Sequence, residues 1–219
     1  MSGDESTSLN RIGHTVLLAG LLALGGWLRL RFINTVHLYP DEFATLFAVQ
    51  MIREKGLPVM PSGLFYEHGL LFSYAGSLAA LFGPPPQTVR YASLLFGLAT
   101  LGLTYAVGRR WFSPAVGLIA TAGLALAPTA VHWSGRARMY ALLQLLLLLT
   151  LWLAYEGLRR DQARLRWAAL LAYLGAMLTH FVSVTLAPPL VLVALVSFWQ
   201  RRAGEQGSGG AGENSPPHP

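Results

Sequence analysis

The feature that most constrains this chain is a series of apolar stretches, each about as long as a helix needs to cross a bilayer, roughly 20 residues. Charged residues make up 12% of the sequence, about half the share found in soluble domains. Pro188 and Pro189 lie within the last stretch, so its boundary with the one before is left open. The sequence predicts an all-α integral membrane protein with about six transmembrane helices, at residues 12–33, 89–107, 114–131, 140–158, 167–182 and 183–199.

Three other segments are predicted not to cross the membrane. Residues 1–11 are acidic and serine-rich and lack a basic signal-peptide region, so they are interpreted as a cytoplasmic segment before a retained span. Residues 69–82 are apolar but short, and are interpreted as a helix that lies against or dips into the membrane surface. Residues 200–219 are rich in Gly, Ser and Pro and are predicted to be a disordered cytoplasmic tail.

The distribution of arginines fixes the predicted orientation, because cytoplasmic loops of membrane proteins carry an excess of Lys and Arg. With both termini in the cytoplasm, the basic clusters fall in inner loops, and residues 34–88 form a long first outer loop with amphipathic helices. Counting residues 69–82 as a span would move the first two clusters outside. The inner clusters are Arg109 and Arg110, then Arg159, Arg160, Arg164 and Arg166, then Arg201 and Arg202.

Composition also excludes some classes of function. The chain has no cysteine, so it forms no disulfide framework and no thiolate metal site. Its net charge of +6 lies in an apolar chain, which indicates membrane lipids and phosphate groups as partners before nucleic acid.

The predicted outer face holds few acids, yet two of them, Asp41 and Glu42, are adjacent and directly follow the first span. Arginine binds phosphate oxygens through paired hydrogen bonds, and a carboxylate can take a proton from an attacking hydroxyl. Both are what chemistry on a phosphorylated lipid requires. The other outer ionisable residues are Glu54, Glu67, Arg31, Arg53, Lys55, Arg90, Arg136, Arg138, His37, His68, His132 and His180.

Several motifs occur in an order that is typical of one family. They are "YPDEFATLFAVQMIREKGLPVMPSGLFYEHG", "RYASLLFGLATLGLTYAVGRRWFSPAVGLIATAGLALAP", "SGRARMYALLQLLLLL" and "LAYLGAMLTHF". Over residues 12–199 the sequence resembles the N-terminal transmembrane module of the GT-C superfamily of polytopic glycosyltransferases. Within it, the sequence is most similar to the protein O-mannosyltransferase and aminoarabinose transferase branch.

The resemblance implies transfer of a sugar from a polyprenyl-phosphate donor to an extracytoplasmic acceptor on a protein, glycan or lipid. Asp41 matches the catalytic base, and Glu67 matches an acid that orients a partner or holds a cation. The lipid-phosphate contacts match His68, Arg90 and Arg138. The candidate catalytic residues are therefore Asp41, Glu42 and Glu67, and the candidate substrate-binding residues are Tyr66, His68, Arg90, Arg136, Arg138 and His180.

The sequence departs from the family pattern in three ways. His68 stands where the related transferase has lysine, so its charge depends on pH. The "GRARMY" segment lacks acids, which weakens the requirement for a metal. No metal ligand is predicted, and a divalent cation is left open as a cofactor. The family usually has a longer chain, so a further chain that completes the transferase is left open as a partner.

Alternative interpretations remain at this stage. The chain as a whole fits a non-catalytic or truncated module that acts as a lipid-binding or partner subunit. A transporter is disfavoured, because no charged residue is expected deep in a span and no inverted repeat is evident. Asp41 alone fits an N-cap of a helix over residues 42–54, and Arg90 fits an anchor at a span end. The absence of cysteine and the family branch favour a bacterial cytoplasmic membrane.

The topology also predicts the geometry of the site. Asp41 and Glu67 should lie near the guanidinium groups of Arg90 and Arg138 in one outer cavity. A sugar between acid and phosphate requires a separation of about 5 to 10 Å between Asp41 and Arg138, without a tight bidentate pair.

Topology reporters test this orientation. A reporter fused after Arg110 or after Arg160 should give a cytoplasmic signal, and one fused after Pro84 should give an extracytoplasmic signal. A cytoplasmic signal after Pro84 would mean that residues 69–82 cross the membrane, and the site assignment would then be lost.

Overall fold

The chain is built from helices, as predicted. The computed structural model describes residues 2–196 and 199, and among them the only β-type pairing is one isolated bridge between Val59 and Phe65. The elements are α1 (Ser2–Thr35), α2 (Pro40–Lys55), α3 (Leu70–Ala79), α4 (Gln87–Trp111), α5 (Pro114–Leu126), α6 (Pro128–Ser134), α7 (Tyr140–Arg159), α8 (Ala163–Thr179) and a 3-10 turn (Phe181–Leu186).

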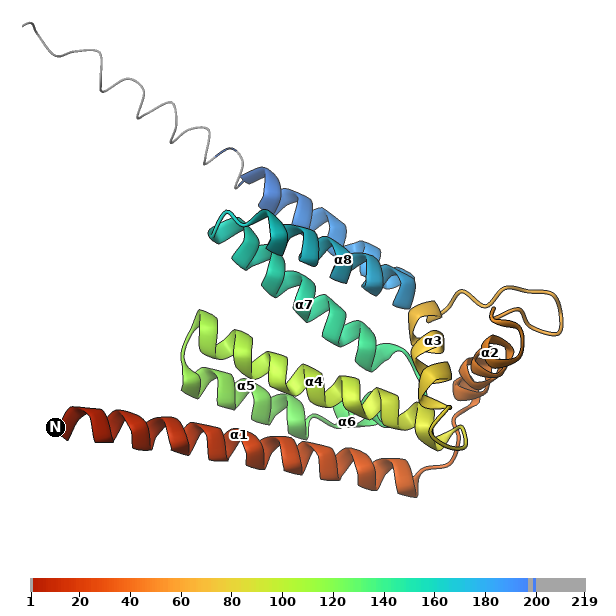
Figure 1. Cartoon of the computed structure of the whole chain (residues 1–219), viewed down its shortest axis with the longest axis horizontal. Helices are drawn as coiled ribbons and strands as arrows, with labels where there is room; N and C mark the ends of the chain where they lie inside the picture. The colour runs from red at the N-terminus through yellow and green to blue at the C-terminus, as the bar shows by residue number, and fades with distance from the viewer. Residues whose placement is uncertain (1, 197–198, 200–219) are drawn as a thin grey trace, which may run out of the picture.

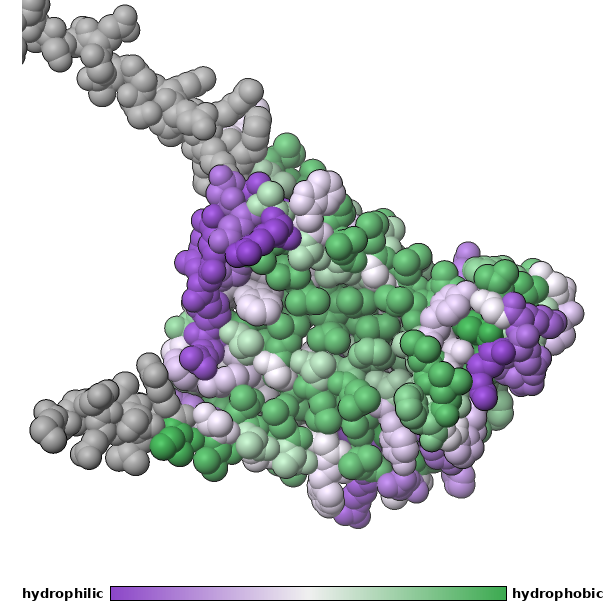
Figure 2. All heavy atoms as spheres, in the orientation of Figure 1, coloured by the Kyte–Doolittle hydropathy of each residue, from purple (hydrophilic) through white to green (hydrophobic). Residues whose placement is uncertain are grey.

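The long helices run along one common direction, and the short ones gather at one end (Figure 1). The start of α1, the α4–α5 turn and the α7–α8 turn lie at one end of the bundle. The helices α2, α3 and α6 lie at the other end, which is called the site end below. Figure 2 shows a hydrophobic flank between these ends, with hydrophilic residues gathered at both of them. This distribution fits an integral membrane protein.

Judged by helix length and composition, fewer helices can cross a membrane than the six predicted. Among the described residues, three helices meet both criteria: Ile12–Thr35, Gln87–Trp111 and Tyr140–Arg159. The bent pair α5 and α6 brings the number to four at most. α8 has 17 residues and ends at His180, whose backbone is extended, and the apolar segment Phe181–Val196 is also short. The six-span count is therefore not confirmed, and the predicted tail over residues 200–219 lies outside the described residues.

The helix α3 is too short to cross a bilayer, as expected for residues 69–82. It has 10 residues, so it is about 15 Å long, half the thickness of a bilayer core. It lies across the direction of the long helices and contacts α2, α4 and α8 (Figure 1).

The predicted span at residues 114–131 is broken in two. α5 ends at Leu126, Ala127 is extended, and α6 starts at Pro128 after a bend of 66°. A proline disfavours helical backbone at the residue before it and has no N–H to continue the ladder. The break changes the direction of the chain before α6. The loop that follows α6, residues 135–139, is called the arginine loop because it carries Arg136 and Arg138.

A buried arginine inside the first span was not expected. Arg29 lies in α1 and is 1% exposed, and its Nη1 donates to the backbone oxygens of Gly25 at 2.9 Å and Ala125 at 3.3 Å. The expectation that no charged residue lies deep in a span overlooked Arg29, because the apolar average of residues 12–33 hides both Arg29 and Arg31.

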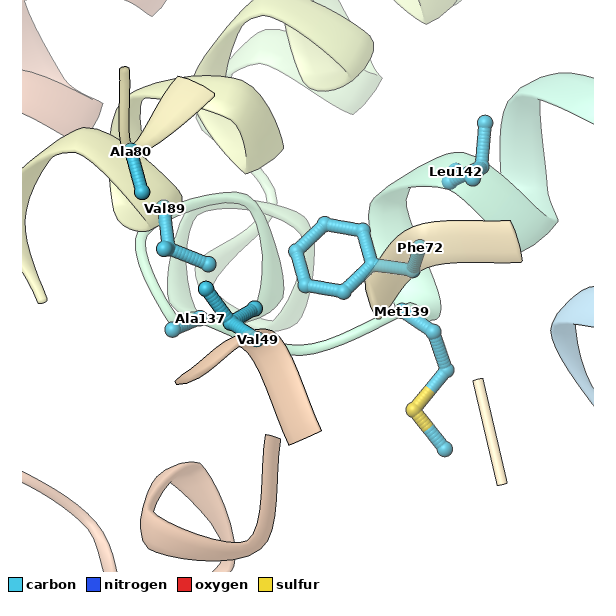
Figure 3. Packing of buried hydrophobic residues seen from close by; sticks show 7 residues of the cluster. All are labelled: Val49, Phe72, Ala80, Val89, Ala137, Met139 and Leu142. Carbon is cyan, nitrogen blue, oxygen red and sulfur yellow. The ribbon is translucent and has the colours of Figure 1, made fainter. Parts of the chain in front are cut away.

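A small hydrophobic core holds the outer elements onto the helix ends. Val49 of α2, Phe72 of α3 and Val89 of α4 pack together, and each is 0% exposed (Figure 3). Ala137 and Met139 of the arginine loop complete the cluster with Ala80 and Leu142. Burying these side chains fixes α2 and the arginine loop relative to each other, and this pairing forms the site.

The pair α4 and α5 depends on two facing glycines, as expected of small-residue contacts in membranes. A Cβ on Gly108 would lie 2.7 Å from the Cα of Gly117, whereas a Cβ on Gly102 meets nothing within 4 Å. We expect Gly108→Ala to lower stability by about 1–3 kcal/mol, because backbone cannot yield as a side chain can. Thermal unfolding in detergent measures this effect.

The matched control is Gly102→Ala on the same helix. It should leave the midpoint of thermal unfolding unchanged or raise it, since alanine is more favourable than glycine within a helix by about 1 kcal/mol. Equal midpoints for the two variants would contradict the close packing of α4 on α5.

Candidate active site

The centre of the site end is the buried carboxylate of Glu42, which is 0% exposed. Arg90 binds it in bidentate fashion, Nε to Oε1 and Nη2 to Oε2, both at 2.8 Å. Arg136 Nη1 donates to Oε2 at 3.0 Å. The backbone N–H groups of Ala137 and Tyr39 donate at 2.7 and 2.8 Å. Five hydrogen bonds enclose this carboxylate, which leaves no oxygen open to a substrate.

These partners keep Glu42 ionised. Burial would raise the pKa of its carboxyl group, but the hydrogen bonds from Arg90, the Ala137 and Tyr39 backbones and Arg136 outweigh burial and lower the pKa to about 2. Glu42 is therefore ionised at any physiological pH. Its buried, fully hydrogen-bonded carboxylate has a structural role.

Arg90 uses all of its donors within the protein. Its remaining N–H groups donate to the backbone oxygens of Ile33, Val36 and His37 at 3.3, 3.2 and 3.1 Å. A guanidinium has five N–H donors, and all five are taken. In this arrangement Arg90 has no donor left for the phosphate contact that the resemblance implies. It ties the start of α4 to the end of α1 and the start of α2.

Arg136 lies beside this ion pair. Its Nη1 also donates to the His37 carbonyl at 2.7 Å, and its guanidinium stacks over the rings of Phe32 and Tyr39 at 5.3 and 5.2 Å. Its Nε is buried without a partner. The side chain thus joins the arginine loop to α1 and to the residue that precedes α2.

Asp41 has the opposite environment to Glu42, since its side chain is 54% exposed. The start of α2 also corrects its expected role as an N-cap: Tyr39 is the N-cap, Pro40 is the first helical residue, and Glu42 closes the capping box onto the Tyr39 N–H. Asp41 and Glu42 are consecutive helical residues, so one faces outward while the other is buried.

Arg138 reaches Asp41 directly. Its Nη1 donates to the Asp41 backbone oxygen at 3.0 Å, to Thr45 Oγ1 at 3.3 Å and to Tyr66 Oη at 3.3 Å. Its Nη2 lies 4.0 Å from Asp41 Oδ2, and its Nε is buried without a partner. The separation is shorter than the predicted 5 to 10 Å, because the first turn of α2 packs directly on the arginine loop. The two side chains form no bidentate pair, as predicted.

A pocket of about 280 Å³ is lined by His68 and His180, whose ring neighbours Tyr66 and Tyr140 both contact Arg138. Arg138 stacks over Tyr140 at 5.7 Å, and the Tyr140 ring lies 5.9 Å from His180. The ring of His68 lies 6.2 Å from that of Tyr66 on the other side. The pocket combines polar and apolar walls, and its lining consists of Glu67, His68, Leu70, Met177, Leu178, His180 and Phe181.

The fold therefore brings the candidate residues to one end of the molecule. Arg90 and Arg138 lie on the same side as Asp41, while Glu67 is at the pocket rim and makes no ion pair with them in the part of the chain described. Within residues 2–196 and 199, no three His, Asp or Glu side chains converge as metal ligands.

Sequence reasoning missed two contacts of Arg138, Thr45 and Tyr140. Thr45 lies one helical turn after Asp41, so the i, i+4 spacing could have revealed it.

The comparison with known families identifies the family of the chain. The model of the dolichyl-phosphate-mannose-protein mannosyltransferase family matches residues 67–207, which is more than half of the chain. The matched region includes the pocket and the arginine loop, and it begins after α2. No curated protein matches the chain.

The Glu42 cluster predicts a pH-dependent loss of stability. The pKa of Glu42 is about 2 in the fold against an ordinary value of 4.5, so its contribution is complete above pH 4.5 and is lost as pH falls toward 2. At pH 7, Glu42→Gln should destabilise the chain by about 3–5 kcal/mol, because two buried arginines lose their anion. Thermal unfolding from pH 7 to 3 measures the difference.

Glu54→Gln on the same helix is the matched control, because Glu54 is exposed and accepts a hydrogen bond from Gln50 on the helix surface. It should unfold like the native chain. If Glu42→Gln is as stable as this control at pH 7, the cluster does not hold the site together.

Proposed function

The chain belongs to the dolichyl-phosphate-mannose-protein mannosyltransferase family, a GT-C type of membrane glycosyltransferase, and we propose that its site end moves a sugar from a polyprenyl-phosphate donor to an extracytoplasmic acceptor. The acceptor supplies a hydroxyl or amine on a protein, glycan or lipid. The observation that carries the proposal is the contact between exposed Asp41 and buried Arg138, beside a pocket with polar and apolar walls.

The donor phosphate is assigned to Arg138. This side chain is 7% exposed, yet its Nε has no partner and its Nη2 approaches Asp41 only at 4.0 Å, so it retains capacity to bind an anion. His68 adds an imidazole that can donate a hydrogen bond at the pocket. His180 also lines the pocket, and Tyr66 holds Arg138 in place through its hydroxyl group.

The apolar wall of the pocket suits the polyprenyl chain. Leu178 and Phe181, which line the pocket together with the two histidines, are 53% and 68% exposed. A lipid whose phosphate lies at Arg138 would lay its first prenyl units against these side chains.

Asp41 is assigned the role of general base. It accepts the proton of the acceptor hydroxyl or amine while that oxygen or nitrogen forms a bond to the anomeric carbon. The bond from this carbon to the phosphate oxygen breaks, and its electron pair leaves with the polyprenyl phosphate. Arg138 and the imidazole of His68 stabilise the charge that grows on the leaving group. A single displacement of this kind inverts the anomeric centre.

Glu42, Arg90 and Arg136 support this chemistry without touching the substrate. Glu42 is shared by the two arginines, which leaves Arg138 as the arginine directed toward Asp41. Glu67 at the rim is assigned to orient the donor or His68. The basic clusters at the opposite end of the bundle favour an extracytoplasmic site end, in a bacterial cytoplasmic membrane.

The base is tested by Asp41→Asn in proteoliposomes supplied with polyprenyl-phosphate mannose. Release of polyprenyl phosphate should fall by about 10²–10⁴-fold, because the amide cannot accept the proton. Donor affinity should change little, since Arg138 and the pocket remain. Asp161→Asn, the same chemical change in the α7–α8 turn at the opposite end, should leave release unchanged.

Normal release by Asp41→Asn would remove the catalytic role. A native chain that binds polyprenyl phosphate but releases none from any donor would instead be a lipid-binding or partner subunit.

A further inference from the structure

A further buried arginine lies outside the site, within the first membrane-spanning helix. Arg29 is 1% exposed, and no carboxylate in the described part of the chain forms an ion pair with it. Ionisable side chains inside a membrane are costly and are usually retained for a function. The function of Arg29 must come from what its guanidinium touches.

The surroundings of Arg29 are shaped to fit it. A Cβ on Gly25 would lie 3.3 Å from its Nη1, and a Cβ on Gly97 would lie 3.2 Å from its Nε. The same Cβ on Gly97 would lie 2.7 Å from the Cβ of Ser134. Small residues of α1 and α4 therefore leave room for the guanidinium between α5 and α6. Larger side chains at these positions would displace it.

The hydrogen bonds of Arg29 fall at the break between α5 and α6. The last carbonyl groups of a helix have no helical partner, and in a bilayer they find no water. Arg29 Nη1 donates to one of these groups, Ala125 O, two residues before the extended Ala127. Arg29 thereby stabilises a bend of 66° that would otherwise expose polar backbone within the membrane.

The break is connected to the site by contiguous contacts. The next turn of α1 carries Phe32, whose ring lies 5.2 Å from that of His132 on α6 and 5.3 Å from the guanidinium of Arg136. α6 ends at Ser134, and the arginine loop follows at once. A shift of α6 would therefore move Arg136 and Arg138 relative to Asp41.

We propose that Arg29 is a positioning residue for the candidate active site. By holding the α5–α6 break, it fixes α6 and so places the arginine loop against the start of α2. Its effect on substrate rests on the proposed function, whereas its effect on α6 does not. It acts through the fold and touches no substrate.

The absence of cysteine gives a direct test. Ser134 is 2% exposed, so Ser134→Cys in the full chain should react slowly with N-ethylmaleimide. Adding Arg29→Met should speed the reaction by about tenfold or more, because α6 opens locally. Arg31→Met, on the same helix but exposed, should leave the rate unchanged. Equal labelling rates with and without Arg29→Met would overturn the proposal.

Two further measurements complete the test. Arg29→Lys keeps the charge and reaches one carbonyl, so it should restore part of the protection; this variant decides the question if Arg29→Met does not elute as a monodisperse species. Binding of farnesyl phosphate should weaken by about tenfold in Arg29→Met and recover in Arg29→Lys, since small displacements of a positioned group cost affinity.

The two proposals fail in different ways. A native chain that does not bind farnesyl phosphate would count against the proposed function, and the labelling rates would still decide the role of Arg29. Unchanged farnesyl phosphate affinity in Arg29→Met, with native binding intact, would count against positioning.

Discussion

The site end depends on one buried anion, Glu42. Its carboxylate joins segments that are far apart in the sequence: the start of α2, the start of α4 through Arg90, and the arginine loop through Arg136 and the Ala137 N–H. Arg90 then extends the network to three carbonyl groups after and within the last turn of α1. Removing ions from water is costly, and an arrangement that leaves any of these partners unpaired costs still more. The network therefore favours a single packing of the outer elements.

The adjacent acids Asp41 and Glu42 show how helix geometry separates two roles. Pro40 starts α2, which puts Glu42 at the third helical position, where its side chain turns back to the Tyr39 N–H and faces the core. Asp41 is rotated away by one residue, so its side chain is half exposed while its backbone oxygen is held by Arg138. The buried Glu42 fixes the first turn of α2 and thereby positions the exposed Asp41. A short acidic pair thus supplies both an anchor and a group free to react.

Some of this arrangement could be predicted from sequence and some could not. Apolar length predicted the all-α membrane fold, and the arginine distribution predicted that residues 69–82 would not cross it. The span count is not confirmed where single residues matter: Pro128 starts a new helix within one apolar run, and α8 ends before the extended His180 in another. The ion pair between Arg90 and Glu42 could not be predicted from the spacing of residues in the sequence. The two residues are 48 positions apart and meet only when the start of α2 lies against the start of α4.

The balance of charge at the site end indicates which kind of ligand it favours. Three nearly buried arginines, Arg90, Arg136 and Arg138, face two carboxylates, Asp41 and Glu42, and the first two arginines share Glu42. The group as a whole therefore carries one more positive than negative charge, and Arg138, which does not share Glu42, has only the half-exposed Asp41 at 4.0 Å as its carboxylate partner. In a region of low dielectric such an excess strongly favours an additional anion. A phosphate bound there would draw Arg138 away from Asp41, and the carboxylate would then be free to act as a base. In the proposed reaction, the positive charge that binds the donor phosphate would thus also release Asp41 to activate the acceptor.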